Sequence, residues 1–136
     1  MEPQYPILLT ITDSLPVTNQ LLESGLRYSA YEYLRSKYKF NVKEFSKLIR
    51  ISTSTAQRRR HQGAMSFRES ELLVRYAKLL DAAVDLMDGN VELALDWIQK
   101  PALYFGGESP LSVSITSVGA EDVLSFVGRL SLGSCN

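Results

Sequence analysis

Polar and basic side chains are concentrated between residues 41 and 63, NVKEFSKLIRISTSTAQRRRHQG. Three consecutive arginines occupy positions 58–60, and Gln57 precedes them. Arginine can make a paired contact to guanine and glutamine to adenine, whereas lysine and arginine elsewhere hold phosphates. The chemistry that suits these residue types is therefore recognition of DNA.

Two short helices and a tight turn would have to position these side chains. Asn41 predicts the start of a helix over residues 42–49, because its side chain can accept a hydrogen bond from the first helical turn. Ser52 predicts a second helix over residues 53–61 in the same way, and Gly63 predicts its end. The pattern favours a helix-turn-helix, in which the second helix presents its polar face to the major groove.

Three positions fit the contact between the two helices, and two depart from it. Ser46 is small, Ile51 can anchor the turn, and Ala56 can face inward on the second helix. Arg50 stands where the turn often has glycine, so a left-handed backbone there would cost about 1–2 kcal/mol. Arg59 falls where a half-buried apolar residue would be comfortable, and we expect its aliphatic stem to pack while its head reaches outward.

The residues that we expect at DNA follow from this arrangement. Lys43, Lys47, Arg50 and Arg60 suit phosphates, which set the register of a protein on DNA. An ordinary helical hairpin with a solvated basic face is the alternative interpretation. The complete set of expected DNA-binding residues is Lys43, Lys47, Arg50, Ser52, Thr53, Ser54, Thr55, Gln57, Arg58, Arg59, Arg60 and His61.

The formal net charge is zero, but the charges are unevenly distributed. Between residues 35 and 62 there are nine lysines or arginines and one acid, Glu44. Between residues 69 and 97 there are seven acids against Arg75 and Lys78. The asymmetry favours one half that faces a polyanion and another that avoids it, although two ordinary solvated surfaces would also account for it.

The composition bounds the class of protein. A length of 136 residues with 45% apolar residues suits one domain, or two small ones that share a core. The lone cysteine, Cys135, excludes an internal disulfide and fits a cytoplasmic protein. The first residues do not have the pattern of a signal peptide, and no apolar run is long enough to span a membrane.

No catalytic or metal-binding constellation is apparent. One histidine, His61, and one cysteine cannot supply the four ligands of a structural zinc site within one chain. No nucleophile has a base and an orienting partner at a suitable spacing. We therefore expect no cofactor, no metal and no enzymatic activity.

The rest of the chain predicts an all-α protein with about seven helices. Residues 5–12 alone favour a short strand or an extended arm. Gly25 is expected to interrupt a helical stretch over residues 18–38. Ser66 and Glu69 have the spacing of a capping box, which predicts a long helix to about Met87. Further helices are predicted over residues 91–98 and 119–132.

Apolar spacing predicts the inward faces and the division of the chain. The first helix of the pair should bury Val42, Phe45, Leu48 and Ile49, and the last helix should bury Val123, Leu124, Val127 and Leu130. The expected parts are an N-terminal arm over residues 1–17, a helix-turn-helix DNA-binding domain over 18–64 and a second helical domain over 65–136.

A specific string of residues follows the basic segment. Trp97 and Pro101 are followed by Gly106-Gly107, then Pro110-Leu111, and then Gly119 and Val123. Together with Thr55, Arg58, Leu72, Arg75, Ala94, Leu130 and Gly133, this string resembles the Xre/MbcA/ParS antitoxin family over about residues 42–133. Taken singly, Trp97 is better explained as a core residue, and the paired glycines as sources of backbone freedom.

The resemblance implies a type II antitoxin that works as a dimer, neutralises a toxin by direct contact and represses the operon that encodes both. The usual toxin of such systems has a RES domain and acts on NAD⁺. From position in the chain, we expect the toxin contact near the last helix and the short tail over residues 132–136. The expected residues are Glu121, Asp122, Ser125, Arg129, Ser131, Leu132, Gly133, Ser134, Cys135 and Asn136.

Two other functions are compatible with the same residues. A stand-alone transcriptional regulator would use the second half to sense a ligand or a partner. A purely protein-binding inhibitor would use the basic face for a purpose other than DNA binding. A gene for a RES-type toxin next to this one would favour the antitoxin.

Overall fold

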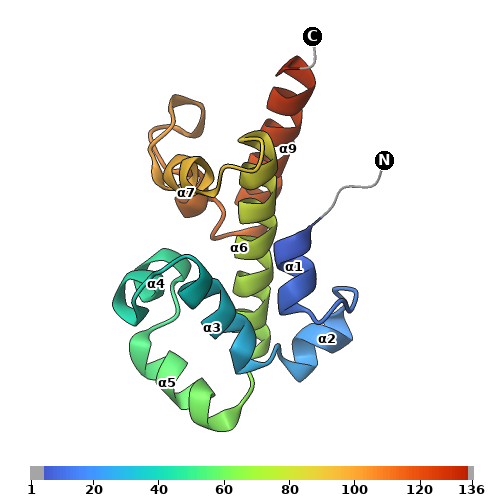
Figure 1. The fold of residues 1–136 in the computed structure, drawn as a ribbon, viewed down its shortest axis with the longest axis vertical. Coiled ribbons are helices and arrows are strands. Elements are labelled where there is room, and N and C mark those ends of the chain that lie inside the picture. Colours follow the sequence, from blue (N-terminus) through green and yellow to red (C-terminus); the bar gives the residue numbers. More distant parts are fainter. Residues whose placement is uncertain (1–4, 135–136) are drawn as a thin grey trace. The chain divides into compact units, whose positions relative to one another are not determined.

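The computed structural model describes residues 5–134 and confirms the all-α prediction (Figure 1). Within this range no strand is present, and the only extended pairing is a single bridge between Arg27 and Ala64. No helix among the described residues is long and apolar enough to cross a membrane. The helices are α1 (Pro6–Ile11), α2 (Asn19–Ser24), α3 (Tyr28–Lys37), α4 (Val42–Ile49), α5 (Thr53–Gln62), α6 (Phe67–Leu86), α7 (Val91–Gln99), the 3-10 helix η1 (Leu103–Phe105), α8 (Pro110–Val113) and α9 (Ser117–Ser134).

The chain forms two compact units, which divide within α6. The N-terminal unit spans Pro6–Ala77 and contains α1 to α5 and the first part of α6. The C-terminal unit begins at Lys78 and contains the rest of α6 together with α7 to α9. The predicted boundary near residue 64, between a DNA-binding and a second helical domain, stays a prediction, because a division into compact units does not show which residues bind a partner.

The predicted strand or arm over residues 5–12 is wrong, because residues 6–11 form α1. Proline suits the first position of a helix, where its missing N–H costs no hydrogen bond. Ile7, Leu8 and Ile11 recur at helical spacing and are buried. The β-branched residues suggested a strand, but burial of this apolar face determines the helix instead.

Gly25 separates α2 from α3, as the sequence predicted. Its φ of 85° is a conformation that suits glycine, and a side chain there would meet the Met65 carbonyl oxygen at 2.0 Å. The neighbouring backbone is held by two hydrogen bonds, from the Met65 N–H to the Leu26 carbonyl at 2.8 Å and from the Leu26 N–H to the Ser70 hydroxyl at 2.9 Å. These contacts fix the start of α3 beside the start of α6.

Aromatic side chains form the core of the N-terminal unit. Phe45 of α4 is fully buried, and its ring centre lies 5.1 Å from that of Tyr31 and 5.7 Å from that of Tyr76. Burial raises the pKa of Tyr31 to about 12. The first helix of the pair is therefore anchored on α3 and α6, although Val42, predicted to face inward, is 37% exposed.

Sequence-encoded caps set the helix boundaries of the C-terminal unit. The Asn90 side chain accepts a hydrogen bond from the Leu93 N–H at 3.1 Å and starts α7. Ser109 caps α8 at the Ser112 N–H, and Pro110 follows at the first helical position. The core residues of this unit include Ala94, Ile98, Leu111, Val123 and Val127.

The last helix departs from the prediction at its end. α9 continues to Ser134, so the expected tail after residue 132 is helical up to that residue. Val123 and Val127 are buried as predicted, whereas Leu130 is 39% exposed. The side chains of residues 132–134 are not described, and Cys135 and Asn136 lie outside the described residues.

Candidate nucleic-acid and protein interfaces

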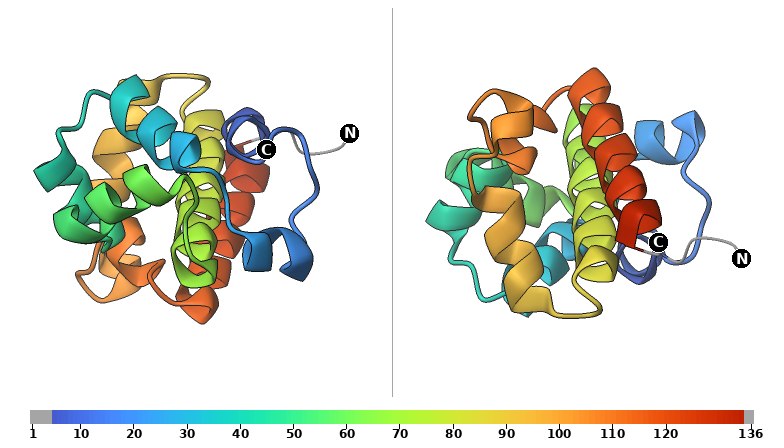
Figure 2. Two further views of the ribbon diagram at one scale, coloured as in Figure 1. Left: turned by 90° about the horizontal axis from the view of Figure 1, so that it is seen from below. Right: turned by 90° about the horizontal axis from the view of Figure 1, so that it is seen from above.

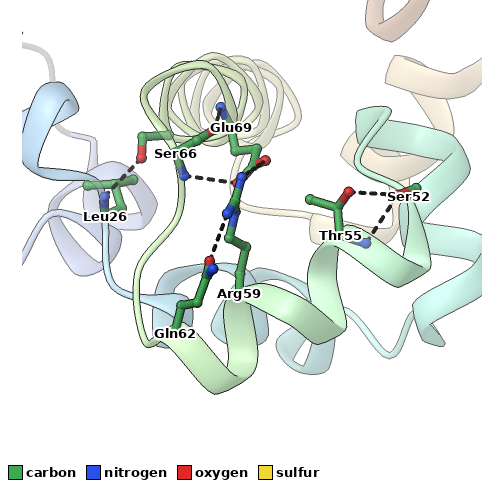
Figure 3. A network of polar contacts seen from close by, with 8 residues as sticks. Leu26, Ser52, Thr55, Arg59, Gln62, Ser66 and Glu69 are labelled. Carbon is green, nitrogen blue, oxygen red and sulfur yellow. Dashed lines mark hydrogen bonds and ion pairs between the residues drawn. The ribbon is translucent and has the colours of Figure 1, made fainter.

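The α4–α5 pair has the local geometry that its sequence predicted. The Asn41 side chain accepts a hydrogen bond from the Glu44 N–H at 2.8 Å and begins α4. The Ser52 hydroxyl accepts one from the Thr55 N–H at 3.2 Å and begins α5 (Figure 3). Gly63 ends α5 with a φ of 86°. These three boundaries are thus set by residue types that are typical of helix starts and ends.

A left-handed residue and two buried side chains make the turn between the helices. Arg50 has φ 60° and ψ 39°, and its N–H bonds the Ser46 carbonyl at 2.9 Å. Ile51 and Ala56 are each only 2% exposed. The expected left-handed backbone at Arg50 and the inward positions of Ile51 and Ala56 are confirmed.

One face of α5 carries exposed side chains that can hydrogen-bond to bases. Ser54, Gln57, Arg58 and His61 are all exposed and recur at spacings of three and four. This spacing brings them onto the side of the helix opposite to buried Ala56. The Gln57 amide has the donor and the acceptor that a paired contact to adenine requires, and the Arg58 guanidinium has the donors that guanine requires.

Arg59 differs from both of its arginine neighbours. Its guanidinium donates to Glu69 through Nε at 2.7 Å and through a terminal nitrogen at 3.0 Å, and the other nitrogen donates to Gln62 at 2.7 Å (Figure 3). The Arg59 and Glu69 side chains are 19% and 13% exposed. The expectation that the Arg59 head reaches outward is therefore wrong, because Glu69 binds it at the start of α6.

Glu69 also completes the predicted capping box. Its carboxylate accepts the Ser66 N–H at 2.9 Å, and the Ser66 hydroxyl accepts the Glu69 N–H at 3.2 Å. Burial alone would raise the pKa of Glu69, but the hydrogen bonds from Arg59 and Ser66 outweigh it and lower the pKa. The hydrogen bond to Glu69 also raises the pKa of Arg59. One carboxylate thus holds the end of α5 and the start of α6 together.

The other residues predicted at DNA flank the exposed face of α5. Thr55 is half-buried, and its hydroxyl accepts a hydrogen bond from the Ser52 hydroxyl at 2.9 Å. The cations suited to phosphates come from α4, the turn and the end of α5. The flanking residues with exposed side chains are Lys43, Lys47, Arg50, Ser52, Thr53 and Arg60.

The predicted protein-binding residues form an exposed side of α9. Glu121, Asp122, Ser125 and Arg129 are exposed, while Val123 and Val127 between them are buried. Ser131 is half-buried. The structure therefore brings the four exposed residues onto one helix surface, as a contact with another protein requires.

Two apolar residues before α8 were not predicted at a surface. Leu103 is 98% exposed and Tyr104 is 51% exposed. Tyr104 stacks on Phe126 of α9, with ring centres 4.2 Å apart. The Arg129 guanidinium lies 5.5 Å from the centre of the Tyr104 ring and donates a hydrogen bond to its hydroxyl. The sequence feature that could have indicated this exposed site is the apolar run before Gly106-Gly107, but such a run is also typical of a buried segment.

The described residues contain no cluster of three or more histidine, cysteine or acidic side chains that could hold a metal ion. The exposed polar surfaces of α5 and α9 can supply hydrogen bonds and charges to a macromolecule. Both surfaces are therefore suited to binding. The α5 surface offers hydrogen-bond donors and cations, and the α9 surface offers acidic and basic side chains and an aromatic ring.

Comparison with known proteins relates the C-terminal part to a family. The profile described as antitoxin Xre/MbcA/ParS C-terminal toxin-binding domain matches residues 82–133. Antitoxin Xre of Yersinia enterocolitica serotype O:8 / biotype 1B is 39% identical over 82 residues, which are 60% of this chain and 55% of that protein. The match thus spans about half the length of this relative.

A second relative extends the similarity toward the N-terminus. Antitoxin Xre of Photorhabdus laumondii subsp. laumondii is 28% identical over 123 residues, which are 90% of this chain and 83% of that protein. These matches confirm the family resemblance that the motifs predicted. Both relatives are named as antitoxins.

Proposed function

We propose that this chain is a type II antitoxin that neutralises a cognate toxin by direct contact, because residues 82–133 match the profile described as the antitoxin Xre/MbcA/ParS C-terminal toxin-binding domain. The observation that carries the proposal is this match, because the description of the matching family names toxin binding. It includes the exposed residues Glu121, Asp122, Ser125 and Arg129 of α9. The antitoxin needs no catalytic group for this task, since occupying the entrance to an active site is enough to block it.

The toxin that we propose has a RES domain and consumes NAD⁺. This follows from the resemblance of the chain to antitoxins that are encoded with such enzymes. Neutralisation would take place in the cytoplasm, where NAD⁺ is available to the toxin.

The second part of the proposal is repression of the operon through DNA. The support is the α4–α5 pair, with a three-residue connection and an exposed face of Ser54, Gln57, Arg58 and His61. We assign Gln57 and Arg58 to bases and the flanking cations to phosphates. Arg59 is excluded from the set of DNA contacts, because its guanidinium is bound to Glu69. A homodimer would place two such helices on the two halves of an operator.

Two variants test the two activities separately. Arg58→Ala removes an exposed donor and should weaken operator binding by roughly 5- to 150-fold, as expected for one paired base contact of about 1–3 kcal/mol. Deletion of residues 131–136 removes the end of α9 and should weaken toxin inhibition. Operator affinity is measured by gel shift with the promoter of the chain's own operon, and inhibition by growth rescue on co-expression with the protein from the adjacent gene.

Each variant is the control for the other. Arg58→Ala should rescue growth as the unaltered chain does, and the truncated chain should bind the promoter normally. Normal repression by Arg58→Ala would refute the assignment of the DNA-reading helix. Failure of the unaltered chain to rescue growth would refute the antitoxin function as a whole.

A further inference from the structure

The loop between α7 and α8 presents an apolar side chain to solvent. Leu103 is 98% exposed, and the neighbouring Tyr104 is 51% exposed. Phe105, the third residue of η1, is buried and attaches the loop to its unit. Core packing therefore explains Phe105 but not Leu103, and it leaves half of Tyr104 exposed. Contiguous exposed apolar groups are a mark of interaction surfaces.

Hydrogen bonds hold this loop in one conformation. The Ala102 N–H bonds the Glu108 carbonyl at 3.0 Å, and the Gly107 N–H bonds the Ala102 carbonyl at 3.0 Å. Gly106 and Gly107 both have positive φ, at 66° and 88°, which closes the turn without strain. A loop that is already ordered loses little conformational freedom when a partner binds. Leu103 is thus presented as a fixed projection.

α9 supports the loop through an aromatic cluster. Phe126 stacks on Tyr104, and its ring centre lies 5.3 Å from that of Phe105 in an edge-to-face arrangement. Arg129, one turn further along α9, covers the Tyr104 ring and bonds its hydroxyl. These contacts join the loop to the exposed side of α9; the two segments are drawn in orange and red in Figure 2.

We infer that Leu103, Tyr104 and Arg129 form the centre of the surface that docks the toxin. The inference rests on the proposed antitoxin function, and it names a part of that interface which the sequence motifs did not indicate. The three residues lie within residues 82–133, and the family whose profile matches this segment is described as toxin-binding, which favours the toxin as the occupant. The chemistry of the surface requires a toxin with an apolar recess for Leu103 and a carboxylate near Arg129.

The test replaces the projecting leucine. Leu103→Asp should leave the fold intact, because the side chain makes almost no contact with its own chain. Its affinity for the purified protein from the adjacent gene should fall at least about tenfold, since binding would otherwise bury a whole leucine side chain. Arg129→Ala should weaken the same affinity. Leu15→Asp is the matched control, because Leu15 is an exposed leucine of the other unit, at 53%.

The affinity for the toxin is measured by calorimetry. For every variant, the melting temperature reports folding, a gel shift reports promoter binding, and light scattering gives the molar mass. A loss confined to Leu103→Asp and Arg129→Ala, with normal promoter binding, supports the inference. Unchanged toxin affinity of Leu103→Asp overturns it while the antitoxin function stands. A change of molar mass without loss of toxin affinity also overturns it, because the surface would then belong to a second copy. If the unaltered chain does not bind the toxin, both proposals fail.

Discussion

At the scale of single residues, neighbouring arginines of α5 have different surroundings that their identity does not reveal. Arg58 and Arg60 are exposed, whereas the guanidinium of Arg59 between them is bound to Glu69. The difference arises because successive helical residues point about 100° apart, so only one of the three faces the start of α6. The sequence flagged Arg59 as anomalous, but its partner lies ten residues away, across a turn whose geometry no local pattern specifies.

The Arg59–Glu69 pair predicts a pH-dependent stability. The pKa of Glu69 is lowered in the folded chain, so the unfolded chain binds more protons and stability falls with acid. The contribution is fully present above the ordinary pKa of about 4.5 and is lost as the pH falls through the lowered folded value. Glu69→Gln keeps an oxygen for the Ser66 N–H and removes the ion pair. It should lower the free energy of unfolding by about 1–3 kcal/mol at pH 7.

Urea denaturation of both chains at pH 7 and at about pH 3 measures this effect. The difference between the unaltered chain and Glu69→Gln should shrink at the lower pH, since the carboxylate becomes protonated there. Asp96→Asn is the control, because the Asp96–Lys100 pair is more than half exposed and should contribute little at either pH. An equal difference at both values would mean that the ion pair does not stabilise the fold.

At the scale of elements, the predictable features were those with local causes. Asn41, Ser52 and Ser66 each predicted a helix start, and each side chain accepts the hydrogen bond expected of it. A cap is formed within four residues, so the sequence alone contains it. α1 was missed because burial, rather than propensity, determines a helix of this length. The exposure of Leu103 was missed because a short run of apolar residues predicts burial, whether the folded chain buries it or not.

The turn between α4 and α5 predicts a conflict between stability and DNA binding. Arg50 holds a left-handed conformation that glycine adopts without a steric penalty. Arg50→Gly should therefore raise the free energy of unfolding by about 1 kcal/mol, within the penalty for a non-glycine residue there. The same change removes a cation that we assign to phosphate, so operator affinity should fall for every operator sequence alike.

Lys39→Gly separates the two effects, since Lys39 also has a positive φ, of 61°, but is not among the proposed DNA contacts. Thermal unfolding should show a similar gain for both variants, and a gel shift should show weaker binding for Arg50→Gly alone. Equal operator affinity of Arg50→Gly and the unaltered chain would remove Arg50 from the phosphate contacts.

At the scale of the whole molecule, a neutral chain combines a basic segment with an acidic one. The nine cations between residues 35 and 62 belong to the N-terminal unit, while the acids at positions 81, 85, 88, 92 and 96 belong to the C-terminal unit. The net charge therefore says nothing about DNA binding, whereas the distribution predicts which unit binds. The uneven distribution of charge could be read from the sequence. The division between the two units could not, because it falls inside the continuous helix α6, where no turn or linker marks a boundary.

This distribution predicts the salt dependence of operator binding. With phosphate contacts from Lys43, Lys47, Arg50 and Arg60, the logarithm of the affinity should fall with the logarithm of salt concentration at a slope of roughly −0.9 × 4, or about −3.6, per chain. A dimer would double the slope to about −7. Lys43→Ala should make it shallower by about 0.9 per chain, since each phosphate contact releases its own counterion. Titrations of labelled operator across a fourfold range of salt measure it.

The control for this titration is a lysine of the other unit. Lys100→Ala removes an exposed cation of the C-terminal unit and should leave the slope unchanged. A slope near zero would contradict the basic surface of α4 and α5 as the DNA contact. A slope that changed equally with Lys43→Ala and Lys100→Ala would mean that DNA responds to the total charge of the chain. Only a response confined to Lys43→Ala fits contacts made by one defined surface.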